Sequence, residues 1–308
     1  MIDYFCNRVY NNTIETLNAI SYAKINLHLD VGSKRADGFH EIYSFFKAIS
    51  FHDEIQISID KDINKKIKDK KLIEIKGKFS CNDENNLIYK AAIRFMENFG
   101  SYFSVQFNVN KRIPEGGGLG GGSSNAAAVL KALNSYFNDF FGKEELKNIA
   151  LSIGSDIPFF LEESTTALVS GRGDIVEPIF IDMPEYNLLL VYPGFKIKTA
   201  DAYLWLDNDR KNSEYNIEKI DYNMFFDYPS KWRFINSFKK PLEKRFEIYD
   251  RIFAVLNDNG SDFFNITGSG SIVYGIFTDM GNLNKAYSDI KEFCPDIWIT
   301  NTLAGRSS

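Results

Sequence analysis

The segment PEGGGLGGGSSNAA, residues 114–127, constrains this chain more than any other part of its sequence. Glycines leave consecutive backbone N–H groups with no Cβ in front of them, so these groups can converge on an anion. A helix of small residues is expected directly afterwards, from Ser123 to Phe137, and would add the positive end of its dipole. The segment therefore predicts a phosphate-binding loop in which the Ser123 and Ser124 hydroxyls bind phosphate or its magnesium ion.

Three other interpretations of the glycine run fit the sequence less well: a dinucleotide-binding motif, a P-loop and a flexible linker. Gly116, Gly118 and Gly121 fit the dinucleotide-binding G-x-G-x-x-G, but the strands expected before the loop are antiparallel, so the βαβ context of that motif is missing. A P-loop needs Ser or Thr after Gly-Lys, and neither Gly-Lys pair of the chain has one. A flexible linker is polar around its glycines, whereas an amphipathic helix follows these.

Length and composition describe an ordinary globular protein. The chain has 308 residues, of which 44% are hydrophobic and 25% charged, and this length favours two domains, with a boundary near Pro184. The net charge of -5 argues against a surface that binds nucleic acid. The Lys-rich stretch from Lys61 to Lys71 contains Asp and Asn and no aromatic residue, which is typical of a solvated loop or hairpin.

Cysteine usage and the amino terminus predict a cytoplasmic protein. Cys6, Cys81 and Cys294 are too far apart in sequence to suggest a metal knuckle or a redox pair. The first residues lack the basic start and apolar run of a signal peptide, and no apolar stretch approaches the roughly 18 residues of a membrane span. We therefore expect a soluble protein without a membrane partner.

Hydrophobic periodicity places helices and strands in an α+β order. Asn86 is expected to cap the first helix and Gly100 to end it. The expected helices cover residues 86–99, 123–137, 143–152, 245–256 and 282–293. The expected strands cover residues 21–31, 42–49, 54–59, 72–76, 103–109, 166–169, 188–192, 271–277 and 296–301, and those at the start are expected to be antiparallel.

The first strand carries polar residues at every second position. Residues 21–31 alternate, with Lys24, Asn26, His28 and Asp30 on the face opposite the apolar side chains, which predicts a half-buried strand. The sequence RADGFH, residues 35–40, follows before the next strand. On this pattern alone, a lysine on such a face is more often solvent-facing than functional.

Several of these motifs together resemble one known family. P-x-x-x-G-L-G followed by Ser-Ser resembles the second motif of the GHMP kinases, and AKINLHLDVGSKRADGFHE resembles the first motif of the branch that phosphorylates 4-diphosphocytidyl-2-C-methyl-D-erythritol. GSDIPFFL, YPGFKIKTADAY and ITGSGSIVYGIF match the same branch. The resemblance is weak before Asn18, in the Lys-rich stretch and over residues 206–230. Phe39 stands where this branch usually has Tyr, so the ring is kept and the hydroxyl is lost.

The resemblance implies both a fold and an activity. The fold is a two-domain α+β GHMP kinase fold, with residues 1–183 like ribosomal protein S5 domain 2, residues 184–308 ferredoxin-like, and the active site in the cleft between them. The activity is ATP-dependent phosphorylation of the 2-hydroxyl of 4-diphosphocytidyl-2-C-methyl-D-erythritol, a step of the non-mevalonate isoprenoid pathway.

The resemblance also assigns catalytic roles. Asp156 would be the base that takes the proton of the substrate hydroxyl, Lys24 would stabilise charge on the transferring phosphoryl group, and Asn26 would orient them. A simpler role for Asp156 is an Asx turn or a helix cap, because Ser-Asp-Ile-Pro is a good turn sequence.

Binding residues follow from the same motifs. His40 would hydrogen-bond the edge of the cytosine base between the rings of Phe39 and Tyr203, with Thr199 and Lys196 nearby, although core packing would equally account for the aromatic residues. Gly268 and Gly270 would let the backbone approach the substrate phosphates, although a tight strand turn would also require such glycines. The residues expected to bind ATP are Pro114, Gly116, Gly117, Gly118, Leu119, Gly120, Gly121, Gly122, Ser123 and Ser124.

We expect ATP and Mg²⁺ as cofactors, with the ion held mainly by phosphates, because no set of carboxylates marks a dedicated metal site. A monomer or weak homodimer is expected. Two other functions stay open: a GHMP kinase acting on homoserine, mevalonate or a sugar, and a catalytically silent nucleotide-binding regulator. The regulator would be expected to lack Lys24 or Asp156, and both are present.

Overall fold

The computed structural model describes residues 9–11, 14–60, 72–211 and 214–305, which form two compact units. Unit 1 comprises residues 1–23, 51–114 and 120–163, and unit 2 comprises residues 24–50, 115–119 and 164–308. Two long strands, β2 (Ile14–Lys34) and β3 (His40–Asp60), contribute residues to both units. The sequence-based boundary at residue 184 stays a prediction, and the Lys-rich stretch lies outside the described residues.

Unit 1 contains strands in the order β1-β2-β3-β5-β4, with β1 at Val9–Asn11, β4 at Ile73–Lys76 and β5 at Ser104–Asn110. The segments expected as two strands at 42–49 and 54–59 are one continuous strand, β3. The expectation of a purely antiparallel start was wrong for β4, which pairs with β5 in parallel. A helix connects these two strands, and such a crossover is what a parallel pair requires.

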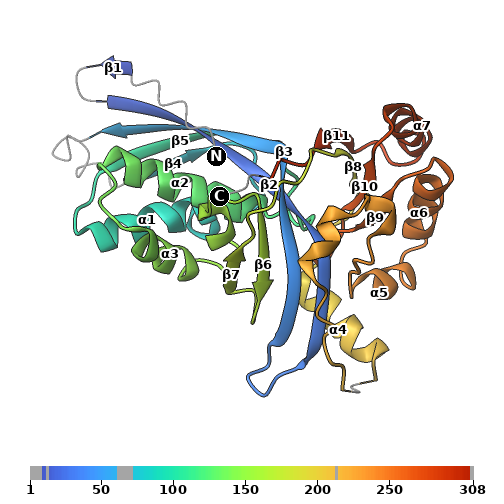
Figure 1. The fold of residues 1–308 in the computed structure, drawn as a ribbon. Coiled ribbons are helices and arrows are strands. Elements are labelled where there is room, and N and C mark those ends of the chain that lie inside the picture. The colour runs from blue at the N-terminus through green and yellow to red at the C-terminus, as the bar shows by residue number, and fades with distance from the viewer. Residues whose placement is uncertain (1–8, 12–13, 61–71, 212–213, 306–308) are drawn as a thin grey trace. The chain divides into compact units, whose positions relative to one another are not determined.

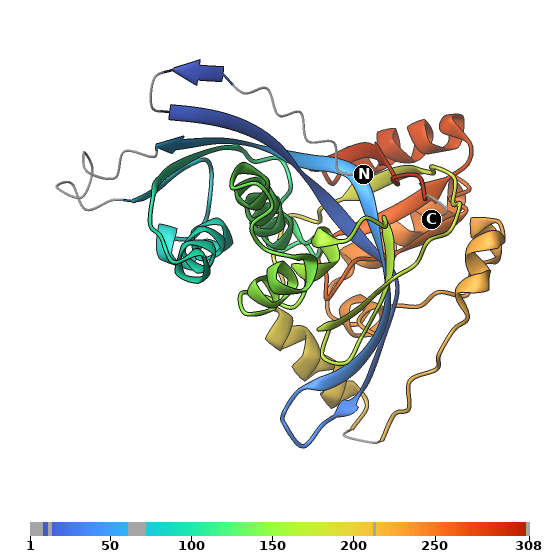
Figure 2. The ribbon, with the colours of Figure 1, turned by 60° about the vertical axis from the view of Figure 1, so that its left-hand side comes forward.

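The helices of unit 1 follow the sequence signals closely. In α1 (Leu87–Phe99), the Asn86 side chain accepts the Ile88 N–H at 3.0 Å and Gly100 ends the helix with φ of 75°, so both predicted caps are confirmed. Together with α2 (Gly121–Tyr136) and α3 (Lys143–Leu151), α1 covers one side of the strands (Figures 1 and 2). Two short 3-10 helices, η3 (Asp83–Asn85) and η4 (Pro158–Leu161), complete the unit.

Unit 2 contains an antiparallel sheet with the strand order β11-β8-β10-β9. In chain order its strands run 4-1-3-2, the order of a ferredoxin-like sheet. Helices α6 and α7 pack against it (Figure 1). The bounds are β8 (Asn187–Val191), α6 (Ile248–Asp258), β9 (Phe263–Ile266), β10 (Val273–Phe277), α7 (Met280–Lys291) and β11 (Ile297–Asn301).

Unit 2 also contains elements that the periodicity did not predict, among them β7, β9 and α4. Strand β6 (Thr166–Ser170) pairs with β3 and with β7 (Ile175–Pro178). Helix α4 (Thr199–Asp209) lies beside the tip of the β2–β3 hairpin in Figures 1 and 2. The remaining short helices are η5 (Tyr222–Phe226), η6 (Pro229–Lys231) and α5 (Lys239–Glu243).

Residues 35–39 form the turn between β2 and β3. Gly38 has φ of 84°, a conformation that few other residues adopt, and the Asp37 side chain accepts the Phe39 N–H at 3.1 Å. The Arg35 N–H donates to the Phe39 carbonyl at 2.6 Å and closes the turn. This geometry places His40 at the first position of β3.

The polar face of β2 is buried, which corrects the expectation of a half-buried strand. Residues from the segment 214–238 cover this face of β2. Among them, the Ser237 and Tyr215 hydroxyls donate hydrogen bonds to Asp30 at 2.9 and 3.2 Å. His28 Nδ1 accepts the Ile235 N–H at 3.2 Å, and burial lowers the pKa of His28 to about 4. The alternation revealed the polar residues but not what packs against them.

A buried lysine on β3 makes the stability of unit 2 depend on pH. Lys47 is fully buried, and its Nζ donates to the hydroxyls of Thr165 and Thr166 at 3.0 Å each. No carboxylate among the described residues pairs with it, and burial lowers the pKa of Lys47 from 10.5 to about 7. The folded protein therefore disfavours the charged lysine.

We expect stability to rise with pH between about 7 and 10.5, because the unfolded chain keeps a proton on Lys47 that the folded protein releases. Lys47→Met should remove this part of the pH dependence and stabilise the protein most below pH 7. Urea unfolding midpoints at a series of pH values measure it, with Lys76→Met, at an exposed lysine, as the control. An unchanged pH slope in Lys47→Met would contradict the assignment.

Candidate active site

Two of the predicted site residues, Lys24 and Asn26, lie next to each other on β2 within unit 2. Lys24 is only 3% exposed, and its Nζ donates to Asn26 Oδ1 at 2.7 Å while lying 4.5 Å from the centre of the Phe46 ring. Asn26 Oδ1 also accepts the Gly268 N–H at 2.8 Å. One amide oxygen thus connects the lysine to a predicted phosphate-binding glycine.

The orientation of the Asn26 amide is fixed by a second chain of hydrogen bonds. Asn26 Nδ2 donates to Ser44 Oγ at 2.9 Å, and the Ser44 hydroxyl donates to the His28 carbonyl at 2.5 Å. Because Nδ2 is used in this way, Oδ1 faces Lys24. Ser44 was missed at the sequence level, since a serine on a strand gives no signal of its own.

The turn at residues 267–271 is held by side chains distant in sequence. The Thr267 hydroxyl donates to the Gly118 carbonyl at 3.0 Å, and Asn236 Nδ2 donates to the Gly268 carbonyl at 2.9 Å. Gly118 has φ of 84°, and a Cβ there would lie 2.1 Å from the Thr267 carbonyl oxygen. Position 118 therefore requires glycine because the two turns approach backbone to backbone.

Thr199 and Gly270 border the same turn. Thr199 is the first residue of α4, and its hydroxyl accepts a hydrogen bond from Ser269 Oγ at 3.3 Å. Gly270 has φ of 90°, and a Cβ there would lie 2.8 Å from Leu242 Cδ1. Lys196 pairs with Glu115 at 3.4 Å. Within unit 2, the structure thus brings Lys24, Asn26, Gly268 and Thr199 around one turn.

The last residues of the glycine loop, from Gly120 on, belong to unit 1 and lead into α2. Gly120 precedes the helix with φ of 69°, and α2 begins at Gly121. Ser124 is buried and accepts the Ser21 hydroxyl proton at 2.7 Å, whereas Ser123 is partly exposed. The two predicted phosphate-binding serines therefore differ, because Ser124 already has a partner in the protein.

One buried carboxylate ties down both ends of the glycine loop. Asp53 is fully buried, and its Oδ1 accepts the N–H groups of Arg112 and Ile113 at 2.7 and 2.8 Å. Its Oδ2 accepts Asn125 Nδ2 at 2.9 Å and lies 2.8 Å from Lys111 Nζ. Asp53 was missed because it lies 59 residues before Arg112, with no shared motif.

Several glycines of the loop occupy positions where a side chain would be strained or would clash. Gly116, Gly118 and Gly120 all have positive φ, and a Cβ at Gly117 or Gly121 would come within 2.5 or 2.7 Å of a buried isoleucine. Side chains are thus excluded at these positions, and backbone N–H groups without a neighbouring Cβ are what the predicted binding of nucleotide phosphates requires. Among the described residues, no group of three or more His, Cys, Asp or Glu is placed to hold a metal ion.

Asp156 lies in unit 1, in the turn between α3 and η4, and is partly exposed. Its carboxylate makes no hydrogen bond or ion pair with any residue that the structure describes, and η4 follows Ile157 without a side-chain cap. The alternative role as a helix cap therefore has no support in the geometry. Lys24 belongs to the other unit, so the pairing of the two residues stays a prediction.

The predicted cytidine-binding residues gather at the tip of the β2–β3 hairpin. The His40 ring lies 4.7 Å from the Tyr203 ring, centre to centre, and His40 Nε2 lies 2.9 Å from Asp207 Oδ1. Phe39 is 54% exposed, with the Arg172 guanidinium 4.9 Å from the centre of its ring. Asp207 is a further residue that sequence reasoning missed.

Comparison with known proteins identifies the family. The model of the GHMP kinases N terminal domain matches residues 86–163. The 4-diphosphocytidyl-2-C-methyl-D-erythritol kinase of Clostridium botulinum is 34% identical over 299 residues, covering 92% of this chain and 99% of that protein. The enzyme of the same name from Thermodesulfovibrio yellowstonii is 37% identical over 279 residues, covering 88% of this chain and 93% of that protein.

This chain belongs to the GHMP kinase family. A crystal structure of 4-(cytidine 5'-diphospho)-2C-methyl-D-erythritol kinase superimposes with a TM-score of 0.76 at 25% identity, covering 94% of this chain and all of that one. The predicted GHMP kinase fold is thereby confirmed, and the family implies the use of ATP. The catalytic and binding roles of single residues stay predictions.

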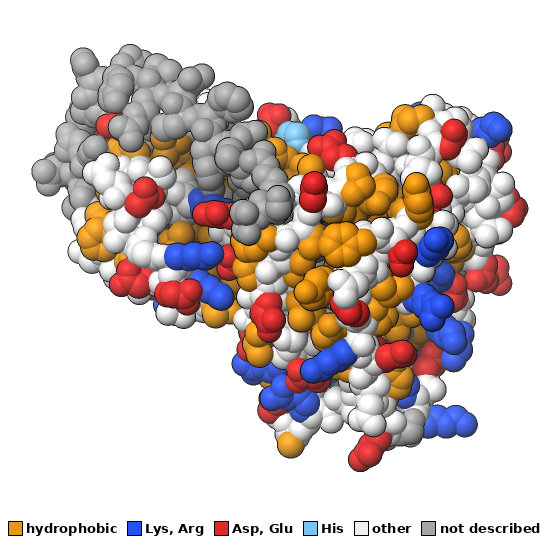
Figure 3. Space-filling model, in the orientation of Figure 1, with side chains coloured by type: hydrophobic (Ala, Val, Ile, Leu, Met, Phe, Trp, Pro, Cys, Tyr) orange, Lys and Arg blue, Asp and Glu red, His pale blue; other side chains and the backbone are white. Residues whose placement is uncertain are grey.

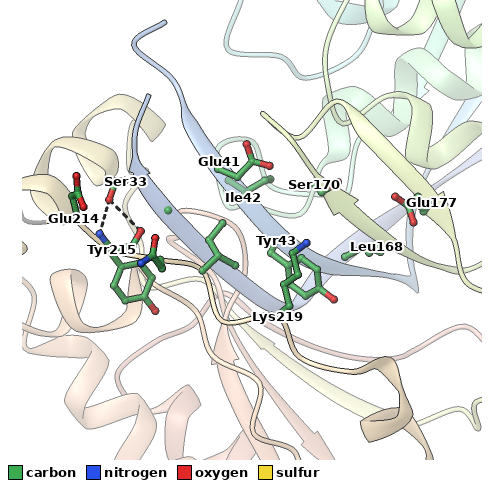
Figure 4. Close-up of a pocket in the computed structure, with 13 residues that line it drawn as sticks. Ser33, Glu41, Ile42, Tyr43, Leu168, Ser170, Glu177, Glu214, Tyr215 and Lys219 are labelled. Carbon is green, nitrogen blue, oxygen red and sulfur yellow. Dashed lines mark hydrogen bonds between the residues drawn. The ribbon is translucent and has the colours of Figure 1, made fainter. Parts of the chain in front are cut away.

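Elsewhere in unit 2 of this GHMP kinase, a cavity of about 840 Å³ lies between the β2–β3 hairpin, β6, β7 and the segment 214–219. Ser33 closes one side by hydrogen bonds to the backbone of Tyr215 (Figure 4). Three carboxylates line the cavity, those of Glu41, Glu177 and Glu214, and they lie apart from one another without converging. None of the predicted site residues lines it.

The described surface in Figure 3 carries acidic and basic side chains interspersed among hydrophobic ones, without one large basic patch on that face. No helix in the described ranges has both the length and the apolar character needed to cross a bilayer. Both observations concern the described residues alone.

The Asp53 network generates a prediction about stability. Asp53→Asn would leave the Lys111 ammonium buried beside a neutral amide, and breaking a buried ion pair costs about 3–5 kcal/mol. We expect a loss of this size in the free energy of unfolding, together with weaker nucleotide binding. Arg94→Gln, which breaks an exposed pair with Glu97, is the matched control and should change little. Equal stability of the two variants would contradict the role of Asp53.

Proposed function

We propose that this chain is an ATP-dependent kinase that phosphorylates the 2-hydroxyl of 4-diphosphocytidyl-2-C-methyl-D-erythritol, a step in making isoprenoid precursors by the non-mevalonate pathway. The observation that carries the proposal is the near full-length similarity, at 34% and 37% identity, to two kinases named for this substrate. The buried Lys24–Asn26–Gly268 constellation supports it, because a kinase needs a fixed cation beside a phosphate-binding turn.

Phosphoryl transfer depends on positioning and on stabilising charge. ATP supplies the phosphoryl group. Lys24 stabilises the charge that develops on this group, and Asn26 holds the ammonium in place through the 2.7 Å hydrogen bond. Asp156 accepts the proton of the substrate hydroxyl; its lack of a partner among the described residues leaves both carboxylate oxygens available.

Nucleotide binding falls to the glycine loop. The backbone N–H groups of Gly116 to Gly122 and the start of α2 hold the phosphates, with Pro114 and Leu119 shaping the loop. Ser123 is the hydroxyl better placed to reach a phosphate or Mg²⁺, because Ser123 is partly exposed whereas Ser124 is buried. Mg²⁺ would be held mainly by the phosphates of the nucleotide, with the Ser123 hydroxyl as a further ligand.

Substrate binding falls to the hairpin tip and to the 267–271 turn. His40 hydrogen-bonds the edge of the cytosine base. Phe39 and Tyr203 flank the ring of the base. Gly268, Gly270 and Thr199 lie near the diphosphate. The three scattered cysteines favour a reducing cytoplasm, where we place the enzyme as a monomer or weak homodimer.

The proposal is tested by a coupled ADP-release assay with 4-diphosphocytidyl-2-C-methyl-D-erythritol, homoserine and mevalonate as separate substrates. We expect ADP release with the cytidine compound alone, because only that substrate uses the His40 region. Release with homoserine or mevalonate alone would instead establish the other GHMP kinase function.

The role of Asp156 is tested in the same assay. Asp156→Asn removes the proton acceptor and should lower kcat by about 10²–10⁴-fold, with the fold and ATP binding retained. Glu144→Gln, which removes an exposed carboxylate from α3, should leave kcat unchanged. Full turnover by Asp156→Asn would show that another group takes the proton.

A further inference from the structure

The imidazole of His40 is held by two contacts within unit 2. Its Nε2 lies 2.9 Å from Asp207 Oδ1, and its ring rests against Tyr203 with an interplanar angle of 36°. Both partners come from α4, whereas His40 begins β3. His40 is 8% exposed, so the ring has little freedom to choose other partners.

Asp207 makes a hydrogen bond to His40, and its charge also interacts with that of Arg210. Two positions further along α4, Asp209 pairs with Arg245 at 3.1 Å and with Lys244 at 3.4 Å. Among the described residues, His40 is the side chain that the Asp207 carboxylate hydrogen-bonds. Neighbouring carboxylates on one helix thus serve different purposes, and the one facing the hairpin tip orients an imidazole.

The contact decides which histidine nitrogen carries the proton. A carboxylate can only accept, so Nε2 must carry a hydrogen to make a bond of 2.9 Å. In the neutral imidazole, Nδ1 then has a lone pair and is an acceptor. We assign this tautomer from the hydrogen-bond geometry.

We propose that Asp207 is a positioning residue that makes the site select cytosine over uracil, by holding His40 with Nδ1 as an acceptor toward the base. This inference rests on the proposed function. Cytosine carries an amino group at position 4, which donates, whereas uracil has a carbonyl there, which accepts. A fixed acceptor at Nδ1 pairs with the amine of cytosine and opposes the carbonyl of uracil, and an unpaired polar group in a closed site weakens binding.

The test uses Asp207→Asn in the full-length protein. An asparagine amide can either accept from Nε2 or donate to it, so the tautomer of His40 is no longer fixed. We expect KM for the cytidine substrate to rise about tenfold, with kcat and the KM for ATP unchanged. With CDP and UDP as competing inhibitors, the preference for CDP should fall by a similar factor. Asp209→Asn, on the same helix, should keep the preference for CDP.

A double-substitution cycle separates positioning from simple structural support. If Asp207 acts through His40, Asp207→Asn should have no further effect on the CDP preference once His40→Gln is present. Additive effects of the two substitutions, or an unchanged CDP preference in Asp207→Asn, would overturn the inference.

The two proposals fail in different ways. If the wild-type protein releases no ADP with the cytidine substrate, the proposed function fails. If it does release ADP but Asp207→Asn keeps the wild-type KM and base preference, only the role of Asp207 fails. Direct calorimetric titration with CDP and UDP gives the base preference without turnover, so it does not depend on the rest of the catalytic apparatus.

Discussion

The hydrogen bond from Lys24 to Asn26 is the interaction on which the rest of unit 2 depends. A buried ammonium needs an acceptor, and the Asn26 amide supplies one while also accepting from the Gly268 backbone. Ser44 fixes the amide from behind, and Asn236 fixes the turn from the other side. Asn26, which is predicted to orient the catalytic groups, therefore also links β2 to the turn at 267–271. A substitution of Asn26 would affect both roles.

Much of the local structure could be predicted from the sequence because its causes are local. Asn86 and Gly100 delimit α1 as expected, since a capping side chain and a residue with positive φ act on their own helix ends. The glycine run and the small residues after it located α2, whose start at Gly121 lies just before the expected one at Ser123. The motif around Lys24 and Asn26 located the polar constellation, because alternation on a strand puts these residues on one face.

Contacts between residues distant in sequence could not be predicted. Asp53 reaches Ile113 and Asn125, Asn236 reaches Gly268, and Asp207 reaches His40 across 167 residues. Each is a single polar side chain with no periodic partner, so its sequence neighbourhood resembles that of any surface residue. The polar face of β2 looked half-buried for the same reason. The segment that covers it, residues 214–238, has little periodicity, and its first part falls in the region of weak family resemblance.

The Asp53 carboxylate has a consequence for how the glycine loop meets its ligand. The same side chain holds Ile113 before the loop and Asn125 after it, so both ends of the loop are fixed to one residue. A chain so constrained has given up most of its conformational freedom during folding, so little remains to be lost when an anion arrives. Glycines normally make a segment flexible, and ordering it on binding then costs entropy. Here the glycines can let the backbone approach the anion closely without that entropic cost.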